Sequence, residues 1–132
     1  MISSHESETI LVVDDSDTVC ELIEILLCRV GYRVLTATNG KDALEIARDT
    51  PRIDLLLSNI DMPGIRGDEV AAQFAVLHPS AAIVFLTSFS VSVQATQPVE
   101  VLFKPFTVAE LRDTVCRALR TRHGLTETPC AA

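Results

Sequence analysis

The stretch TILVVDD, residues 9–15, decides the fold of this chain. Five consecutive apolar or β-branched residues, without the polar alternation of a half-exposed strand, predict a strand that is buried on both faces. The two aspartates that follow place carboxylates at the carboxyl end of that strand. A helix is expected next, with Ser16 as its N-cap and Gly31 as its stop. The chain therefore opens with a strand followed by a helix.

The same alternation continues through the rest of the sequence. We expect further strands at residues 32–36, 53–58, 82–87 and 99–103, and helices at about 40–49, at about 67–77 and after residue 107. Asn39 is the expected cap of the second helix, and Thr107 with Glu110 forms a capping box before the last. Repeated strand and helix units with right-handed crossovers place helices on both faces of a parallel sheet. The predicted fold class is therefore α/β, a flavodoxin-like domain with a five-stranded parallel sheet.

Length and composition agree with a single domain of this kind. With 132 residues, the chain is long enough for one hydrophobic core. Hydrophobic residues make up 48% of the chain but aromatic residues only 5%, so valine, leucine, isoleucine and alanine are expected to form the core. We expect the domain to span residues 9–121, between an N-terminal tail, 1–8, and a C-terminal tail, 122–132.

Charge, hydropathy and cysteine spacing argue against several classes of function. The formal net charge of -7 leaves no basic stripe to neutralise a phosphate backbone, so we expect no nucleic-acid binding by this chain. No apolar run has the length of a membrane-spanning helix, and the first residues lack the features of a signal peptide. We therefore expect no membrane contact and a cytoplasmic location. The four cysteines show no CxxC spacing, which indicates neither a zinc site nor a disulfide framework.

Polar side chains gather where the predicted strands end. They are Asp14 and Asp15 after the first strand, Asn59 and Asp61 after the third, Thr87 at the end of the fourth and Lys104 after the fifth. In open α/β sheets, the carboxyl ends of the strands line the functional crevice. Clustered oxygen ligands suit Mg²⁺, while a hydroxyl and an ammonium suit phosphoryl oxygens. Because the aspartates alone would repel phosphate, the site is expected either to depend on Mg²⁺ or not to handle phosphate.

Four short motifs in this order resemble the receiver domains of bacterial two-component signalling. They are VVDD at residues 12–15, NIDMPG at 59–64, LT at 86–87 and KPF at 104–106, and the resemblance runs from about residue 9 to 120. It implies that Asp14, Asp15 and the backbone carbonyl of Asp61 hold Mg²⁺. It implies further that Thr87 hydrogen-bonds a phosphoryl group and that Lys104 pairs with it, with a cis peptide bond before the proline that follows the lysine.

The resemblance fails at the residue that takes up phosphate. Receivers read Asp-x-x-Met-Pro, and alignment on Met62 and Pro63 puts Asn59 at the acceptor position, with Asp61 out of register. A carboxylate attacks phosphorus to form an acyl phosphate, whereas a neutral carboxamide is a poor nucleophile. Three explanations stay open: natural degeneration, a laboratory change from Asp to Asn, and rescue by Asp61 as an alternative acceptor.

Two further departures favour natural degeneration. Receivers usually carry an aromatic residue three positions before the lysine, where this chain has Val101. Phe103 is expected to point to the other face of that strand and to be an ordinary core residue. Residues 89–98, which are rich in Ser, Thr and Val and end in a proline, predict a short turn or an irregular loop in place of the usual fourth helix.

The leading functional hypothesis is a receiver-like binding module that has lost its phosphorylation chemistry and is not an enzyme. Its expected partner is a sensor histidine kinase or another signalling protein, with homodimerisation as a further option and with Mg²⁺ binding weak or absent. The alternative is an ordinary Mg²⁺-dependent phosphoacceptor, seen as an inactivated variant or using Asp61. Uptake of a phosphoryl group from acetyl phosphate separates the two hypotheses.

Overall fold

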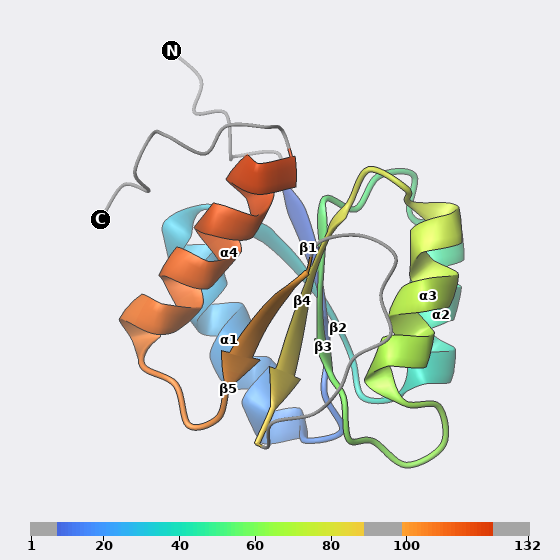
Figure 1. Ribbon diagram of the computed structural model, residues 1–132, viewed down its shortest axis with the longest axis horizontal. Coiled ribbons are helices and arrows are strands. Elements are labelled where there is room, and N and C mark those ends of the chain that lie inside the picture. The colour runs from blue at the N-terminus through green and yellow to red at the C-terminus, as the bar shows by residue number, and fades with distance from the viewer. Residues whose placement is uncertain (1–7, 89–98, 123–132) are drawn as a thin grey trace.

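A five-stranded parallel sheet forms the centre of the computed structural model, which describes residues 8–88 and 99–122 (Figure 1). The strands are β1 (Thr9–Val13), β2 (Arg33–Ala37), β3 (Leu55–Asn59), β4 (Ala82–Thr87) and β5 (Glu100–Phe103). Their order across the sheet is β2-β1-β3-β4-β5, and every neighbouring pair is parallel. The direction in which strands are added therefore reverses between β1 and β3, whose carboxyl ends meet at the predicted site.

Within the described residues, four helices cover the two faces of the sheet. Helices α1 (Asp17–Val30) and α4 (Val108–Arg122) lie on one face, and α2 (Gly40–Asp49) and α3 (Gly67–Leu77) lie on the other (Figure 1). The predicted fold class is confirmed. The short turn or loop predicted at 89–98 lies outside the described residues. None of the helices in the described ranges is long and apolar enough to cross a membrane.

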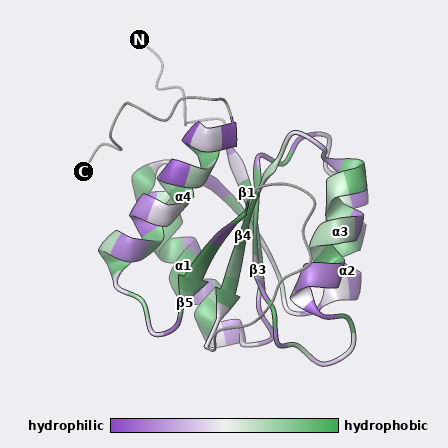
Figure 2. Cartoon of the chain, viewed as in Figure 1, coloured by the Kyte–Doolittle hydropathy of each residue, from purple (hydrophilic) through white to green (hydrophobic). Residues whose placement is uncertain are grey.

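The hydrophobic core has two parts, one on each face of the sheet, because side chains alternate along the strands. In β1, Ile10 and Val12 belong to the part under α1 and α4, whereas Leu11 and Val13 belong to the part under α2 and α3. All residues of β1 and of β3 are buried. Figure 2 shows hydrophobic strands between helices that also carry hydrophilic residues. The buried strand predicted from the TILVV run is therefore confirmed.

Local signals begin and end the helices as predicted. The hydroxyl of Ser16 accepts a hydrogen bond from the backbone N–H of Val19 at 3.3 Å, and Gly31 ends α1 in a left-handed conformation with a φ of 113°. Before α4, the N–H of Glu110 donates to Thr107 Oγ1 at 3.0 Å, and the N–H of Thr107 donates to Glu110 Oε1 at 2.8 Å. The capping box is therefore confirmed.

Three strands differ from their predicted bounds, and of these β5 begins one residue and β3 two residues later than predicted. Strand β2 begins at Arg33 and not at Tyr32, because the N–H of Tyr32 donates to the carbonyl of Leu27 and still closes the end of α1. Strand β3 runs one residue beyond its predicted end, because Asn59 stays in register with Leu86 of β4. Asn59 is thus held by the sheet and not by a loop.

The cysteines do not share one environment. Cys20 is buried and Cys28 is exposed, and both are free thiols. Cys116, on α4, is disulfide-bonded. The sequence did not indicate this disulfide, since spacing along the sequence does not show which cysteines approach each other in space.

Candidate functional site

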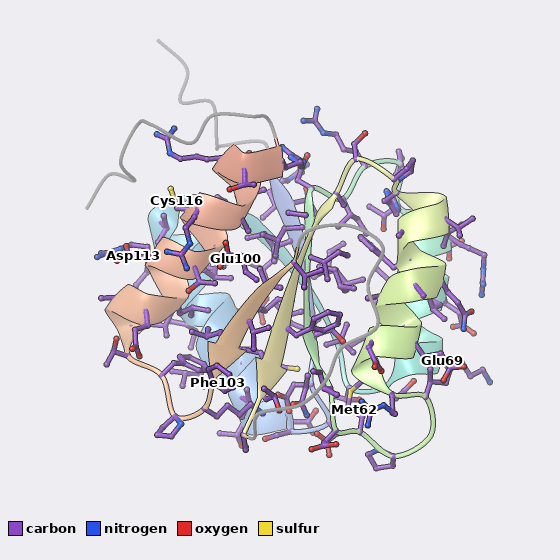
Figure 3. The ribbon with its side chains drawn as sticks, in the orientation of Figure 1. Met62, Glu69, Glu100, Phe103, Asp113 and Cys116 are labelled. Atoms are coloured by element: carbon purple, nitrogen blue, oxygen red, sulfur yellow. The ribbon has the colours of Figure 1, made fainter. Side chains whose placement is uncertain are left out.

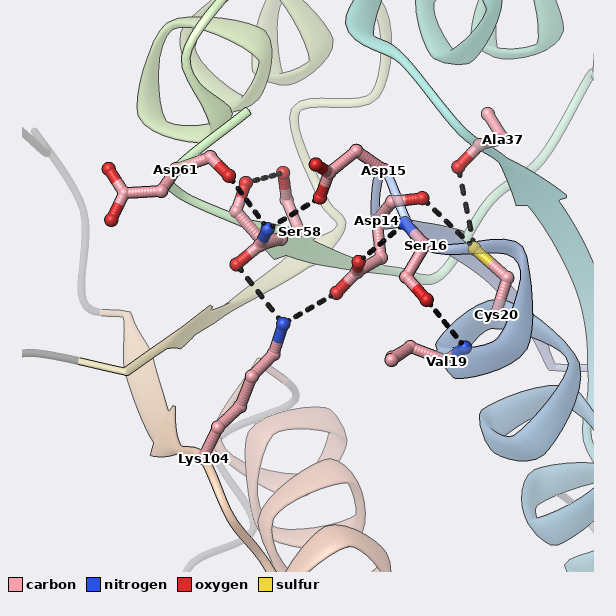
Figure 4. Close-up of polar contacts among 10 residues, drawn as sticks. Asp14, Asp15, Ser16, Val19, Cys20, Ala37, Ser58, Asp61 and Lys104 are labelled. Atoms are coloured by element: carbon pink, nitrogen blue, oxygen red, sulfur yellow. Dashed lines mark hydrogen bonds and ion pairs between the residues drawn. The ribbon is translucent and has the colours of Figure 1, made fainter. Parts of the chain in front are cut away.

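The predicted site residues come together at the carboxyl end of the sheet (Figure 4). Strand β1 is followed directly by Asp14 and Asp15, and β3 ends in Asn59. Lys104 follows β5 and reaches Asp14, which lies 90 positions earlier in the chain. The peptide bond between Lys104 and Pro105 is cis, as the resemblance implied. Strand ends that are far apart in the sequence therefore form one site.

Asp14 is the buried acidic residue of the site. Its side chain is only 1% exposed, and Lys104 Nζ lies 2.8 Å from its Oδ2 atom. The backbone N–H of Ser16 donates to the other oxygen, Oδ1, at 2.9 Å. These two donors offset the cost of burying the carboxylate. In this structure, Lys104 is thus engaged by a carboxylate of the protein itself.

Asn59 hydrogen-bonds to the loop after β1 and to the loop after β3. Its Nδ2 donates to the backbone oxygen of Asp61 at 2.9 Å and to Asp15 Oδ1 at 3.2 Å. Its Oδ1 lies 3.5 Å from Lys104 Nζ, which is a long and weaker contact. This orientation gives each partner a complementary group, because the two acceptors face the NH₂ group and the ammonium faces the oxygen. The amide is therefore fixed from three sides.

Asp61 and Thr87 each contribute a main-chain carbonyl to the site. The residue Asp61 is exposed and its carboxylate points away from Asp15, whereas its carbonyl oxygen accepts a hydrogen bond from Asn59 (Figure 4). Thr87 is buried at the end of β4, and its carbonyl accepts the backbone N–H of Lys104 at 2.8 Å. Thr87 thereby helps to position Lys104, and Asp61 helps to position Asn59.

Two residues that the sequence analysis did not assign to the site contact its backbone. A Cβ atom on Gly67 would collide with the carbonyl oxygen of Asn59, so glycine lets α3 begin this close to β3. The thiol of Cys20 donates to the carbonyl of Asp14 at 3.3 Å, and burial raises the pKa of this thiol to about 11, so that it stays a protonated donor. Glycine at the first position of a predicted helix is a usable signal, whereas the sequence does not mark Cys20.

The aromatic residue next to Lys104 does not lie where it was expected. Val101 packs against the core under α2 and α3. Phe103 is two residues further along β5 and therefore projects from the same face. It is 50% exposed and lies at the end of the edge strand (Figure 3). The expectation of a core residue on the other face is therefore wrong, because side chains repeat every two residues along a strand and an edge strand has a neighbour on one side only.

Comparison with known proteins assigns the family. Residues 10–116 match the response regulator receiver domain, so the chain belongs to this family. It is 37% identical to the uncharacterized transcriptional regulatory protein YrkP of Bacillus subtilis, over 84% of this chain and 49% of that protein. It is 34% identical to the transcriptional regulatory protein ZraR of Klebsiella oxytoca, over 97% of this chain and 31% of that protein. The chain thus spans about half or less of the length of these relatives.

Solved structures show the same fold. The receiver domain of the hybrid histidine kinase CckA is 33% identical, with a TM-score of 0.76 over 84% of this chain and 98% of that chain. A response regulator receiver protein from Sinorhizobium medicae is 27% identical, with a TM-score of 0.81 over 90% of this chain and 99% of that chain. The response regulator TrrA of Thermotoga maritima, solved in complex with Mg²⁺-BeF, is 40% identical, with a TM-score of 0.59 over 63% of this chain and 71% of that chain.

Proposed function

We propose that this receiver domain is a protein-interaction module of two-component signalling that works without taking up phosphate. The observation that carries the proposal is the amide at the acceptor position, where Asn59 donates to Asp15 and to the carbonyl of Asp61. A phosphoacceptor must present a carboxylate oxygen to phosphorus. Here the only oxygen of the side chain belongs to a carboxamide, and it faces Lys104.

The chemistry of the amide supports the loss of phosphotransfer. A carboxylate attacks phosphorus with a full negative charge and gives an acyl phosphate, whereas the neutral oxygen of a carboxamide cannot give that product. Neither neighbouring aspartate takes over in this arrangement. Asp15 accepts a hydrogen bond from the amide, and the carboxylate of Asp61 points away from the site. We therefore propose that the domain acts by contact and is not an enzyme.

The proposed partner is a sensor histidine kinase or another signalling protein, met in the cytosol. A relative whose name supports a role beside sensor kinases is the autoinducer 1 sensor kinase/phosphatase LuxN of Vibrio harveyi. It is 31% identical over 66% of this chain and 10% of that protein. Other relatives are named transcriptional regulatory proteins. These relatives do not support the expectation that nucleic acid plays no part.

Intact mass after incubation with acetyl phosphate and Mg²⁺ tests the proposal. We expect the chain to keep its mass, whereas the variant Asn59→Asp gains one phosphoryl group and so shows that the donor is active. A gain in the unaltered chain overturns the proposal. If that gain disappears in Asp61→Ala, the alternative hypothesis, with Asp61 as the acceptor, replaces it.

A further inference from the structure

We infer that the amide of Asn59 takes the place of a divalent cation, joining the loop after β1 to the loop after β3, so that the site is assembled without metal. The inference deepens the proposed function and rests on it, because a module that takes up no phosphate has no need of a metal for that chemistry. It concerns the same residues that the receiver resemblance assigns to Mg²⁺, which are Asp14, Asp15 and the backbone of Asp61.

All three of these groups already accept hydrogen bonds from the protein. The carbonyl of Asp61 accepts from Asn59 Nδ2 at 2.9 Å, and the carboxylate of Asp15 accepts from the same nitrogen at 3.2 Å. The carboxylate of Asp14 accepts from Lys104 Nζ at 2.8 Å and from the N–H of Ser16 at 2.9 Å. The donors of the protein therefore stand where a cation would otherwise be held.

The residues in this arrangement do not fit Mg²⁺. The ion requires oxygen ligands in near-octahedral geometry, whereas the NH₂ group of Asn59 is directed at the oxygens of Asp15 and Asp61. In the ranges 8–88 and 99–122, no group of three or more histidine, cysteine or acidic side chains is placed to hold a metal ion. The departure from the family pattern therefore lies in the kind of group at position 59 and not only in its charge.

A reversed amide does not restore the metal site. Reversal would turn Oδ1 toward Asp15 and Asp61 and would turn the NH₂ group toward the ammonium of Lys104, so that donors face each other. A cation would relieve the contacts between oxygens but not the contact with Lys104. That ammonium is held 2.8 Å from Oδ2 of Asp14, whose side chain is 1% exposed. A reversed amide would therefore place a second donor beside the ammonium of the buried ion pair, which is unfavourable.

The balance of charge favours the same conclusion. Asp14 and Asp15 are opposed by Lys104, so the cluster has one negative charge in excess, and a carboxylate at position 59 would add another. Like charges in one site repel one another, more strongly where water is partly excluded. The NH₂ group of Asn59 turns partial positive charge toward Asp15. It thus supplies part of the compensation that a cation would supply.

The consequence is a site whose two loops stay joined at any concentration of Mg²⁺. Asp15 belongs to the loop that leads into α1, and Asp61 belongs to the loop that leads toward α3. The amide links these loops through side chain and backbone, without an ion that can be removed. A partner that contacts them therefore meets the same surface in the presence and in the absence of metal.

Mg²⁺ titration of the full chain, followed by calorimetry and thermal melts, tests the inference. From EDTA to millimolar Mg²⁺, we expect the Tm of the unaltered chain to change by less than about 1 °C and no saturable heat of binding. The variant Asn59→Asp should melt lower in EDTA and gain about 5 °C or more with Mg²⁺. The matched control Asn59→Leu, which removes the hydrogen bonds without adding charge, should melt lower in both conditions and show faster hydrogen exchange at residues 60–66.

Saturable Mg²⁺ binding by the unaltered chain, with a gain in Tm parallel to that of Asn59→Asp, overturns the inference. Equal exchange at residues 60–66 in the unaltered chain and in Asn59→Leu overturns it as well. If Asn59→Asp does not fold, the Mg²⁺ titration of the unaltered chain alone still tests the inference. A chain that binds Mg²⁺ but gains no mass from acetyl phosphate refutes the inference alone, whereas a chain that gains mass refutes the proposed function.

Discussion

The two ends of the sheet each bury one aspartate, but they neutralise it differently. At the carboxyl end, Asp14 is 1% exposed, and Lys104 is the charged partner that contacts it. At the amino end, Asp54 is equally buried, and Arg52 and Arg122 each approach its Oδ1 atom to 2.9 Å. The backbone N–H of Thr9 donates to Asp54 Oδ2 at 2.8 Å. A backbone N–H donates to each aspartate, so the two ends differ in charge: two guanidinium groups contact Asp54, whereas a single ammonium contacts Asp14.

The two ends of the sheet differ in the cationic group that contacts the buried aspartate, which is a guanidinium at the amino end and an ammonium at the carboxyl end. Arg122 comes from the last turn of α4 and also contacts Glu8 at 3.5 Å, so the amino end ties both ends of the domain to the start of β3. Burial acts to raise the pKa of Asp54, but hydrogen bonds from Thr9, Arg122 and Arg52 outweigh it and hold the pKa below its ordinary value. The ammonium of a lysine is a point charge on a flexible stem that exchanges partners more readily than a planar guanidinium. We therefore assign a structural role to the amino end of the sheet and a functional role to the carboxyl end.

The largest effect is expected from removing the acid at the amino end. Asp54→Ala leaves Arg122, 10% exposed, beside a vacated carboxylate position, and should lower the free energy of unfolding by about 3–5 kcal/mol. Urea denaturation measures this loss. The control is Asp113→Ala, because Asp113 pairs with Arg112 at 3.7 Å on the exposed side of α4 and should cost no more than about 1 kcal/mol. Equal losses in the two variants would refute the structural role of the amino end.

A smaller loss is expected from the same change at the carboxyl end. Asp14→Ala should lower the free energy of unfolding by about 1–2 kcal/mol, although Asp14 is as buried as Asp54. Lys104 is 24% exposed and can turn to water or to Asp15, and removal of Asp14 also relieves its repulsion with Asp15. The same urea experiment measures both variants. If Asp14→Ala costs as much as Asp54→Ala, the distinction between the two ends does not hold.

The dependence of stability on pH should separate the two ends further. Because the pKa of Asp54 is lowered in the folded state, its ionised form stabilises the protein above the ordinary value of 3.8, and this contribution is lost as the pH falls through the folded pKa. As the pH falls from about 3.8 toward the lower folded pKa, the stability of the unaltered chain should fall more steeply than that of Asp54→Asn, by up to about 1.4 kcal/mol per pH unit. Denaturation at a series of pH values measures both slopes. Parallel slopes would show that Asp54 does not titrate with unfolding.

Sequence signals that act over a few residues predicted most of the fold. The helix caps depend on partners within a few positions, so the local order of residues is enough to identify them. These caps are Ser16 and Gly31 for α1 and the box of Thr107 with Glu110 for α4. The members of the candidate site followed from topology, because parallel strands bring their carboxyl ends to one edge. Asn59 was identified as the departure from the family by position alone.

The pairing within the site could not be predicted in the same way. Lys104 contacts Asp14 across 90 positions, and Asn59 contacts Asp15 across 44, so the choice of partner depends on how the strands pack. Phe103 shows the same limit, because its exposure depends on what covers the edge of β5 and not on its own apolar character. The disulfide of Cys116 likewise depends on which cysteine approaches it in the folded chain, and the spacing of cysteines in the sequence does not predict this.

The most direct test of the central claim uses Mg²⁺ with beryllofluoride, the ligands named for the TrrA structure. Fluorine NMR of the full chain in their presence compares the unaltered protein with Asn59→Asp, in which a carboxylate oxygen replaces the NH₂ group that contacts Asp15 and Asp61. We expect a resonance of protein-bound beryllofluoride in Asn59→Asp and only free species with the unaltered chain. The same bound resonance in both proteins would contradict the claim that the amide of Asn59 closes this site to phosphoryl chemistry.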